Sequence, residues 1–126
     1  MKKKLHILLI AALAIMASGC GKDQPHINVD PAQLEGLWQK STSEVFWRYN
    51  GDRTGVTWDA SEDITEEESN LTFNWELSVD ELTMVFSGAN GNQAVPKVYT
   101  ITSIGDAVMT WRDNYGMTQT FNRVVE

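Results

Sequence analysis

The stretch Asn70–Val79, NLTFNWELSV, alternates apolar and polar residues with a period of two. Because successive side chains of a strand point to opposite faces, this alternation is typical of a β-strand with one face buried. The apolar face holds Leu71, Phe73, Trp75, Leu77 and Val79. The segment directly before it, Asp59–Ser69, reads DASEDITEEES and has no such period. The two segments predict a strand that follows either a solvated connection or a cation site.

Seven further segments have the short length and the turn-residue borders of strands. They read GLWQKSTS (36–43), VFWRY (45–49), TGVTWD (54–59), ELTMVFSG (81–88), KVYTITSI (97–104), AVMTWRD (107–113) and MTQTFNRVV (117–125). Asn50-Gly51 is a strong hairpin signal, because both residues tolerate a positive φ. The expected inward positions of the later strands are Leu82, Met84, Phe86, Tyr99, Ile101, Ala107, Met109, Trp111, Met117, Phe121 and Arg123.

About eight short strands with short connections predict an all-β fold, a small antiparallel up-and-down barrel. Closing the sheet removes the exposed edges that a flat sheet would leave. The interior of an eight-stranded barrel is filled by side chains or holds one small ligand. An open sandwich of two sheets is the alternative architecture. The barrel is expected to occupy residues 34–126 as one domain with one core.

The acidic segment Asp59–Ser69 does not match a calcium loop of the EF-hand type. That loop needs glycine at its sixth position and a bidentate glutamate at its twelfth. Counted from the first residue of the segment, these positions hold Ile64 and Asn70. Thr65 and Glu68 have instead the spacing of a capping box around a single helical turn. The segment is predicted to be a solvated connection, with a weak calcium site as the alternative.

The N-terminus has the parts of a bacterial export signal. Lys2–Lys4 form a basic start, and the apolar run Leu5–Ala17 is short for a transmembrane helix. Ala17–Cys20, ASGC, resembles the lipobox of bacterial lipoproteins. In that family the chain is cut before the cysteine, whose thiol carries diacylglycerol and whose amine is acylated. The resemblance implies a helical signal peptide over residues 1–19 and lipidation of Cys20. An ordinary secretory signal with a chance cysteine is the alternative.

The next segment, residues 20–33, is expected to be the lipidated cysteine followed by a flexible tether. From Gly21 to Gln33 it has two prolines, many polar residues and no sustained periodicity. A tether of this kind would hold a soluble domain close to a membrane. The expected location is the outer membrane, on its periplasmic or its outer face, with the lipid as the membrane partner.

Charge and residue types exclude several functions. The net charge of the chain is −7, and removing Lys2–Lys4 leaves 7 basic against 17 acidic residues, or about −10. Such a surface repels nucleic acids, so no nucleic-acid partner is expected. Cys20 is the only cysteine, and both histidines, His6 and His26, precede the expected barrel. The domain therefore lacks the thiols and imidazoles needed for disulfides, cysteine-ligated zinc or a Ser-His-Asp triad.

Catalysis by carboxylates is the remaining enzymatic interpretation. Paired carboxylates such as Glu76 or Asp113 could hydrolyse a glycosidic bond. Glu76 falls on the polar face of its strand. We therefore expect no enzyme, no cofactor and no metal site in this domain.

Gly36-Leu37-Trp38 opens the first strand as G-x-W and resembles the lipocalin signature. In lipocalins this tryptophan closes the base of the barrel and packs against an arginine from the last strand. The last predicted strand contains Arg123, so the resemblance implies a contact between Trp38 and Arg123. A guanidinium over an indole face stabilises by roughly 0.5–2 kcal/mol.

The order of motifs along the chain also resembles small bacterial lipocalin-like domains that follow a lipobox. The matching motifs are Phe46-Trp47, Gly51–Gly55, Trp58-Asp59, Phe73-Asn74-Trp75 and Asp113–Gly116 with Thr118 and Phe121. The resemblance implies a lipocalin-like barrel with a binding function.

Non-catalytic binding of a small apolar ligand is the first functional hypothesis. Ligand pockets are mostly apolar with a few polar groups, and the strands supply an aromatic wall. The candidate ligand-binding residues are Trp47, Trp58, Phe73, Trp75, Tyr99 and Trp111. Trp58 and Trp75 flank the acidic connection and are the preferred residues for the mouth. The alternative is that these rings only fill the core.

A protein-interaction module is the second hypothesis. Some small lipocalin-like barrels inhibit cysteine peptidases by presenting a loop. The candidate loop is Ser87–Pro96, SGANGNQAVP, which is rich in glycine and long for a hairpin. An ordinary surface loop is the competing interpretation.

Overall fold

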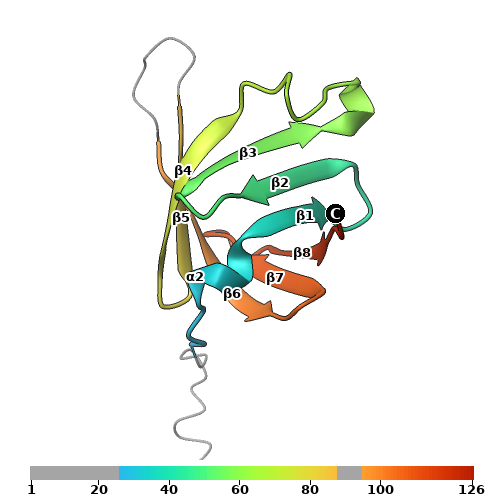
Figure 1. Cartoon of the computed structure of the whole chain (residues 1–126). Coiled ribbons are helices and arrows are strands. Elements are labelled where there is room, and N and C mark those ends of the chain that lie inside the picture. The colour runs from blue at the N-terminus through green and yellow to red at the C-terminus, as the bar shows by residue number, and fades with distance from the viewer. Residues whose placement is uncertain (1–25, 88–94) are drawn as a thin grey trace, which may run out of the picture.

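Eight antiparallel strands close into a barrel in the computed structural model, in the order in which they follow one another along the chain (Figure 1). The structure describes residues 26–87 and 95–126. The strands are β1 (Gly36–Lys40), β2 (Val45–Tyr49), β3 (Thr54–Asp59), β4 (Thr72–Ser78), β5 (Glu81–Phe86), β6 (Lys97–Ile104), β7 (Val108–Arg112) and β8 (Thr118–Arg123). The predicted all-β barrel is confirmed, and the open sandwich is not the observed architecture.

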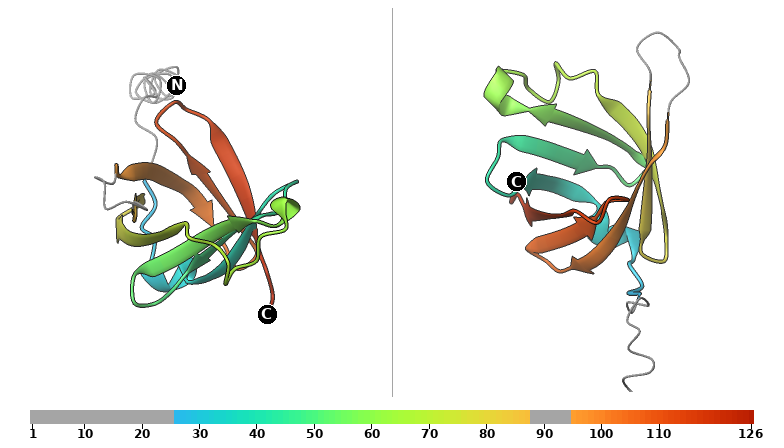
Figure 2. Two further views of the ribbon diagram at one scale, coloured as in Figure 1. Left: turned by 90° about the horizontal axis from the view of Figure 1, so that it is seen from above. Right: turned by 180° about the vertical axis from the view of Figure 1, so that it is seen from behind.

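The first and last strands lie side by side and complete the barrel (Figure 2). Trp38 of β1 lies opposite Arg123 of β8, and Lys40 lies opposite Phe121. Because neighbouring strands are antiparallel, successive connections lie at alternate ends. The connections after β1, β3, β5 and β7 make up what we call the loop end. The connections after β2, β4 and β6, together with the segment before β1, make up the closed end.

The predicted hairpin between β2 and β3 is present, but its left-handed residue is not the expected one. Asn50 donates its backbone N–H to the carbonyl of Thr54 at 2.8 Å, which leaves Gly51–Arg53 as the loop. In three-residue hairpin loops a type I turn is commonly followed by one left-handed residue. That residue is Arg53, with a φ of 73°, and not Asn50 or Gly51.

Apolar side chains from seven of the eight strands and from the segment before β1 fill the interior, and β3 contributes Gly55 and Thr57 to the inner face. The residues with 0–1 % of their surface exposed are Leu34, Trp38, Tyr49, Phe73, Trp75, Leu82, Met84, Ile101, Met109, Trp111 and Phe121. The central positions of the predicted faces are therefore confirmed. Four predicted inward positions at strand ends, Leu71, Val79, Ala107 and Met117, are exposed. The strands begin after or end before these residues, so their side chains lie at the ends of the barrel, where solvent reaches them.

A short helix, α2 (Pro31–Leu34), precedes β1. Asp30 is its N-cap and accepts the backbone N–H of Ala32 at 3.0 Å, while the side chain of Gln33 accepts the backbone N–H of Asp30 at 2.9 Å. This capping box satisfies N–H groups that the first turn would otherwise leave unpaired. Within the described ranges, 26–87 and 95–126, no helix is long and apolar enough to cross a membrane.

The segment from His26 to Leu34 packs against the closed end, whereas a flexible tether was expected up to residue 33. Val29 is 6 % exposed and donates its backbone N–H to the carbonyl of Val79 at 2.9 Å. Leu34 is fully buried beneath the barrel. The tether expectation is therefore wrong from His26 onward, because buried apolar side chains and the capped helix tie this segment to the barrel. Figure 1 shows it below the strands, in blue.

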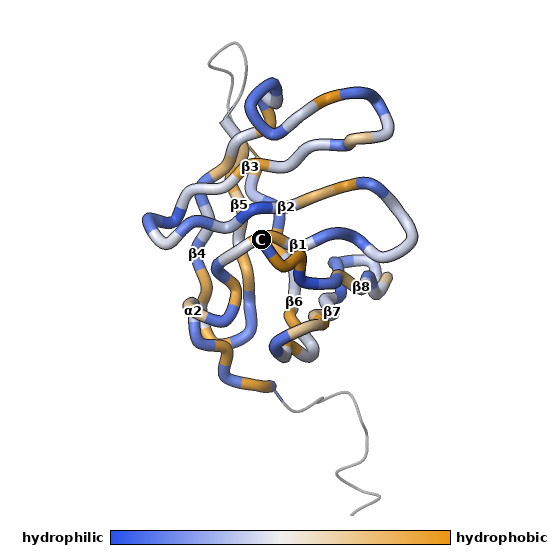
Figure 3. The backbone as a smooth tube through the Cα atoms, turned by 45° about the vertical axis from the view of Figure 1, so that its right-hand side comes forward, coloured by the Kyte–Doolittle hydropathy of each residue, from blue (hydrophilic) through white to orange (hydrophobic). Residues whose placement is uncertain are grey.

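The acidic connection between β3 and β4 is hydrophilic along most of its length (Figure 3). It begins with a 3-10 helix, η1 (Ala60–Glu62). Thr65 donates its backbone N–H to Glu68 Oε1 at 2.9 Å, and Glu68 donates its own to Thr65 Oγ1 at 3.3 Å. These reciprocal bonds confirm the predicted capping box. In the part of the chain that the structure describes, no group of three or more His, Cys, Asp or Glu residues is placed to hold a metal ion.

Arg48 of β2 ties this connection and the C-terminus to the barrel. Its Nε donates to Glu66 Oε2 at 2.5 Å, and its Nη2 donates to Glu126 Oε2 at 2.6 Å. Hydrogen bonds to Glu126 and Glu66 raise the pKa of Arg48 above its ordinary value. The hydrogen bond from Arg48 also lowers the pKa of Glu126. One guanidinium thus joins two segments that are distant in sequence.

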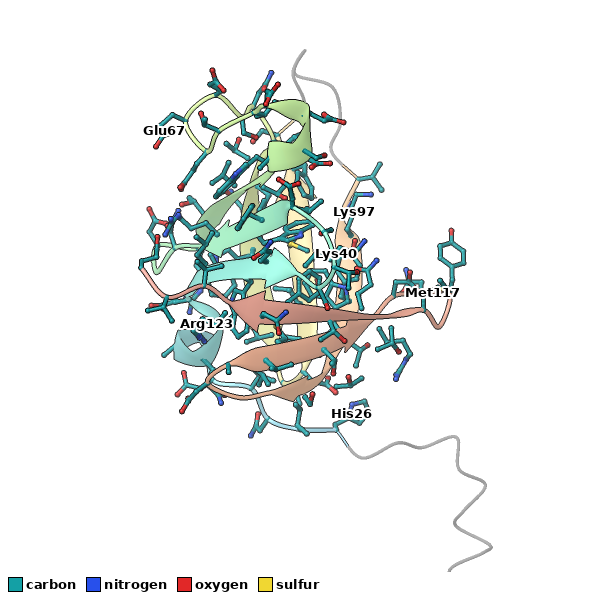
Figure 4. All side chains as sticks on the ribbon, turned by 90° about the vertical axis from the view of Figure 1, so that its right-hand side faces the viewer. His26, Lys40, Glu67, Lys97, Met117 and Arg123 are labelled. Atoms are coloured by element: carbon teal, nitrogen blue, oxygen red, sulfur yellow. The ribbon has the colours of Figure 1, made fainter. Side chains whose placement is uncertain are left out.

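Arg123 joins the last strand to the segment before the first. Its guanidinium carbon lies 4.2 Å from the centroid of the Trp38 ring, so the predicted cation–π contact is present. Its Nε donates to the carbonyl of Asp106 at 2.8 Å, its Nη1 to that of Glu35 at 2.8 Å and its Nη2 to that of Gln33 at 2.6 Å. Figure 4 shows Arg123 beside α2.

Gly36 and Trp38 fit around this arginine. Gly36 has a φ of 124°, and a Cβ built on it would lie 2.7 Å from Arg123 Nη1. The indole Nε1 of Trp38 donates to the carbonyl of Leu34 at 2.9 Å. The glycine of the G-x-W motif therefore gives the arginine room, and the tryptophan gives it an aromatic face.

We expect Arg123→Lys to lower the stability of the protein. Lysine keeps the positive charge but lacks the planar fork that reaches three carbonyls at once. The loss should be about 1–3 kcal/mol, or a fall in Tm of roughly 5–20 °C, measured by circular dichroism.

The matched control is Arg53→Lys. The guanidinium carbon of Arg53 lies 4.7 Å from the centroid of the Trp75 ring, and a lysine can replace a simple cation there. Its change in stability should stay within about 0.5 kcal/mol. Equal losses at both positions would show that the hydrogen bonds of Arg123 to the carbonyls do not matter.

Candidate binding site

Five of the six aromatic residues that the sequence predicts for a ligand wall lie in the interior, as Trp47, Phe73, Trp75, Tyr99 and Trp111. The Trp47 ring lies 5.8 Å, centroid to centroid, from both Phe73 and Trp111. Tyr99 stacks on Trp111 at 4.3 Å. Offset and edge contacts of this kind add to the stabilisation that burial provides. The predicted wall is therefore a connected network of rings.

Trp58 lies apart from this network, on the outer face of the barrel. Its ring stacks on Phe46 at 5.3 Å, and the two residues are partners in the β2–β3 register. The neighbouring partners, Trp47 and Thr57, have their side chains on the inner face, and side chains alternate along a strand. Trp58 therefore does not line the interior, which corrects its expected place in the ligand wall.

Trp75 lies at the closed end and not beside the acidic connection. It is fully buried, and its Nε1 donates to the carbonyl of Thr54 at 3.1 Å. Asn74 is paired with Thr54, the first residue of β3, so Trp75 already lies beyond the end of that strand. Tyr49 links Trp75 to the network at 5.7 Å. The expected pairing of Trp58 and Trp75 at one mouth is thus not observed.

Towards the loop end the interior rings become partly accessible. Trp47, Phe86 and Tyr99 are only partly buried and pack against the fully buried core. Trp111 donates its indole N–H to Gln119 Oε1 at 3.0 Å. We call these five residues, Trp47, Phe86, Tyr99, Trp111 and Gln119, the mouth cluster. Sequence reasoning did not select Phe86 and Gln119 as ligand residues, although both share the inward face of their strands with buried residues.

A hollow of about 290 Å³ opens beside the mouth cluster. Tyr99 and Gln119 of the cluster line it, together with Val95–Val98 and Asp113–Tyr115. Tyr99 and Gln119 therefore border the hollow, while the other three residues of the mouth cluster lie behind them against the packed core.

Three large apolar side chains in or next to the lining of this hollow are exposed to solvent. Tyr115 is 91 % exposed, Val95 is 75 % exposed and Met117 is 63 % exposed. Figure 4 shows Met117 projecting from the turn between β7 and β8. The hollow is therefore bordered by exposed apolar side chains together with polar ones, among them Lys97 and Asn114.

A second hollow, of about 220 Å³, lies at the closed end. His26, Asp80 and Arg112 line it together with apolar and threonine side chains. His26 Nδ1 lies 2.6 Å from Asp80 Oδ2. This pair attaches the first described residue of the chain to the turn between β4 and β5.

The two carboxylates considered for catalysis, Glu76 and Asp113, lie on β4 and in the turn between β7 and β8. Glu76 is exposed on its strand. Asp113 Oδ1 accepts the backbone N–H groups of Tyr115 and Met117, each at 2.9 Å, and so shapes the turn between β7 and β8. Two other candidates, Cys20 and residues 88–94 of the Ser87–Pro96 loop, lie outside the described residues.

The closed eight-stranded antiparallel barrel is compatible with a lipocalin-like fold. Comparisons with protein-family models, with curated proteins and with solved structures found no match to this chain. A binding site is therefore inferred from the geometry of the residues in this chain, and not from similarity to a known protein.

Two tyrosines of the interior have perturbed acidities. Burial, with a smaller contribution from Tyr99, raises the pKa of Tyr49 well above its ordinary value of 10.0. Burial, with a smaller contribution from Asp113, raises the pKa of Tyr99. The Tyr49 hydroxyl has only the sulfur of Met84 as a partner, at 3.5 Å. Both phenols therefore favour the protonated, neutral form in the folded protein.

We expect the protein to lose stability above pH 10 because of Tyr49. Below the pKa of an unfolded tyrosine, about 10, both states carry the proton and the contribution is fully present. Above it the unfolded state releases the proton while the folded state retains it, so stability falls with pH. At pH 11 the loss should be about 1 kcal/mol, measured by denaturant melts at pH 8 and pH 11.

Tyr49→Phe should remove most of this alkaline loss while changing stability little at pH 8. Tyr115→Phe is the control, because Tyr115 is 91 % exposed. An unchanged difference between pH 8 and pH 11 in Tyr49→Phe would contradict the assignment.

Proposed function

We propose that this chain is a lipid-anchored protein of the bacterial outer membrane whose barrel binds a small apolar ligand at its loop end, without catalysis. The observation that carries the proposal is the change in packing along the barrel. At the closed end Trp38 and Trp75 are fully buried, whereas Trp47 and Tyr99 towards the loop end are partly accessible. A concave, open site in which apolar residues lie beside a few polar groups has the features of a small-molecule pocket.

The packed closed end limits where such a ligand can lie. The helix α2, Leu34 and the Trp38–Arg123 contact fill that end. The ligand therefore rests on the mouth cluster and does not descend to the base. This refines the hypothesis of an aromatic wall along the whole barrel to a site near one end.

The position of the N-terminal segment supports the lipid anchor in this proposal. His26 lies at the closed end, beside Asp80 in the turn between β4 and β5 (Figure 4). A tether from a lipidated Cys20 would therefore reach the barrel at the end opposite to the mouth cluster. The mouth would face away from the membrane, where a ligand can enter from water.

The finer assignment, a lipocalin-like lipoprotein, rests on the lipobox-like sequence that ends at Cys20 and on three residues. Gly36, Trp38 and Arg123 follow the order of the lipocalin signature. Their observed contact at the base of the barrel supports this part of the proposal.

The lipid anchor predicts that Cys20→Ala releases the protein from membranes. Cells fed with a clickable palmitate analogue should label the wild-type chain and not the variant, because the variant lacks the thiol and the new N-terminus that are acylated. Fractionation should then move the variant from the outer membrane to the soluble fraction. Equal labelling of both chains would contradict lipidation at Cys20.

The ligand site predicts binding of the apolar dye N-phenyl-1-naphthylamine to the purified protein. Tyr99→Ala should weaken the affinity at least roughly fivefold, because a buried aromatic ring contributes on the order of 1–3 kcal/mol to an apolar contact. Val85→Ala, on the outer face of β5 and 37 % exposed, should leave the affinity unchanged. The measurement is a fluorescence titration.

Native mass spectrometry of protein purified gently from its own host would show a retained ligand as added mass that disappears on denaturation. A bare mass together with no dye binding would contradict the ligand site.

A protein-interaction module is the second candidate function. The exposed apolar rim of Val95, Tyr115 and Met117 favours it, because contiguous exposed apolar surface marks protein contacts. This candidate requires that rim substitutions such as Tyr115→Ser abolish capture of a partner while dye binding persists.

A further inference from the structure

The indole N–H of Trp47 is a buried donor without a hydrogen-bond acceptor in the described part of the chain. Three other tryptophans each have one. Trp38 donates to the carbonyl of Leu34, Trp75 to that of Thr54, and Trp111 to Gln119 Oε1. Within residues 26–87 and 95–126, Trp47 Nε1 is the one buried side-chain nitrogen or oxygen without a hydrogen-bond partner. Since buried polar groups in native proteins are nearly always paired, this donor requires an explanation.

Three aromatic rings surround Trp47, and its cross-strand partner Thr57 uses its hydroxyl to donate to the carbonyl of Phe46. Phe73 and Trp111 lie 5.8 Å from its ring, and Phe86 lies 6.2 Å away in an edge arrangement. An aromatic face accepts a hydrogen bond much more weakly than an oxygen does. These contacts therefore offset only a small part of the free-energy cost of burying the indole N–H.

A lone water molecule would fit these surroundings poorly. Buried waters typically make about three hydrogen bonds. In the mouth cluster, the side-chain oxygen of Gln119 already accepts from Trp111. An apolar ligand that carries one hydrogen-bond acceptor fits these surroundings better than water does, because the site offers one donor, Trp47 Nε1, among aromatic rings.

We propose that Trp47 Nε1 is the polar contact that orients the ligand, and that the ligand is a neutral apolar molecule with an acceptor such as a carbonyl oxygen. This inference rests on the proposed function, because it names the class of ligand for the same mouth cluster. A neutral ligand is favoured because burying a charge among rings is costly. The net charge of −7 and the acidic connection at the loop end also disfavour an anion.

The test uses two probes of nearly the same shape that differ in one atom group. 2-Acetylnaphthalene carries a ketone, and 2-isopropenylnaphthalene has a CH₂ group in place of the ketone oxygen. Both are titrated into the full chain and followed by tryptophan fluorescence. The ketone should bind roughly 3–10-fold more tightly, the gain expected from one net hydrogen bond.

Trp47→Phe should bind both probes with the same affinity, because phenylalanine keeps an aromatic ring and lacks the donor. Trp58→Phe is the matched control, since Trp58 lies on the outer face stacked on Phe46, and it should retain the preference for the ketone. Loss of the preference in Trp58→Phe and not in Trp47→Phe would overturn the inference.

A second readout does not depend on folding of the variant. In protein labelled with ¹⁵N at tryptophan, the indole proton with nuclear Overhauser contacts to the Phe86 ring belongs to Trp47. Its resonance should move downfield with the ketone and stay in place with the alkene.

The two levels of the proposal fail in different ways. Equal affinities of the wild-type chain for the two probes, with the Trp47 resonance unmoved, would overturn the role of the indole and leave the ligand site intact. Binding of neither probe, nor of the naphthylamine dye, would overturn the ligand site and with it this inference.

Discussion

The barrel depends on one arginine side chain, Arg123, which connects the last strand to the segment before the first strand. Arg123 lies at the end of the last strand and bonds to the carbonyls of Gln33 and Glu35, which precede the first. Its guanidinium also covers the Trp38 ring. Carbonyls near a helix end have no partner of their own, and here the arginine supplies it. Sheet closure, the docking of α2 and the filling of the base therefore share a single side chain.

A filled base determines what the rest of the interior can do. Large rings pack against one another from Trp75 through Tyr49 and Phe73 to Trp47. Such an interior is as dense as an organic crystal and leaves little room for a guest. Near the loop end, the rings of Trp47, Phe86 and Tyr99 are only partly buried. In a domain this small, the aromatic residues that fill the core are the same ones that a ligand site would need, so the proposed site is confined to the loop end of the barrel.

The strands could be predicted because each alternates over several residues and ends at turn residues. Alternation fixes the two faces of a strand but not which face is inside, and this is why Trp58 was placed on the wrong side of the sheet. Alternation also does not fix strand ends: Leu71 and Val79 continue the pattern of β4 but lie just outside the strand and are exposed. The capped helix was readable in Asp30-Pro31-Ala32-Gln33, a good N-cap followed by proline and glutamine, yet it was hidden by the polar composition of its surroundings.

Only part of the candidate site can be predicted from the sequence. A run of aromatic residues indicates an apolar interior, but whether a ring faces a neighbour or a hollow depends on register and on the tilt of strands. The unpaired N–H of Trp47 depends on the positions of all its neighbours and has no sequence signature. The contact between Trp38 and Arg123 could be foreseen, because it follows from a resemblance in which two distant residues have known places.

The way in which the barrel closes also has a consequence for its folding. The hydrogen bond between Arg123 and Gln33 joins residues 90 positions apart, so the chain must emerge almost completely before its ends can meet. Until then β1 has an unpaired edge, and unpaired edges invite association with other chains. Folding rates fall as contacts become more distant in sequence. The native barrel has no exposed strand edge, but the contact that closes it forms late in folding. Before that step, dilution or chaperones would keep the exposed edge of β1 from pairing with other chains.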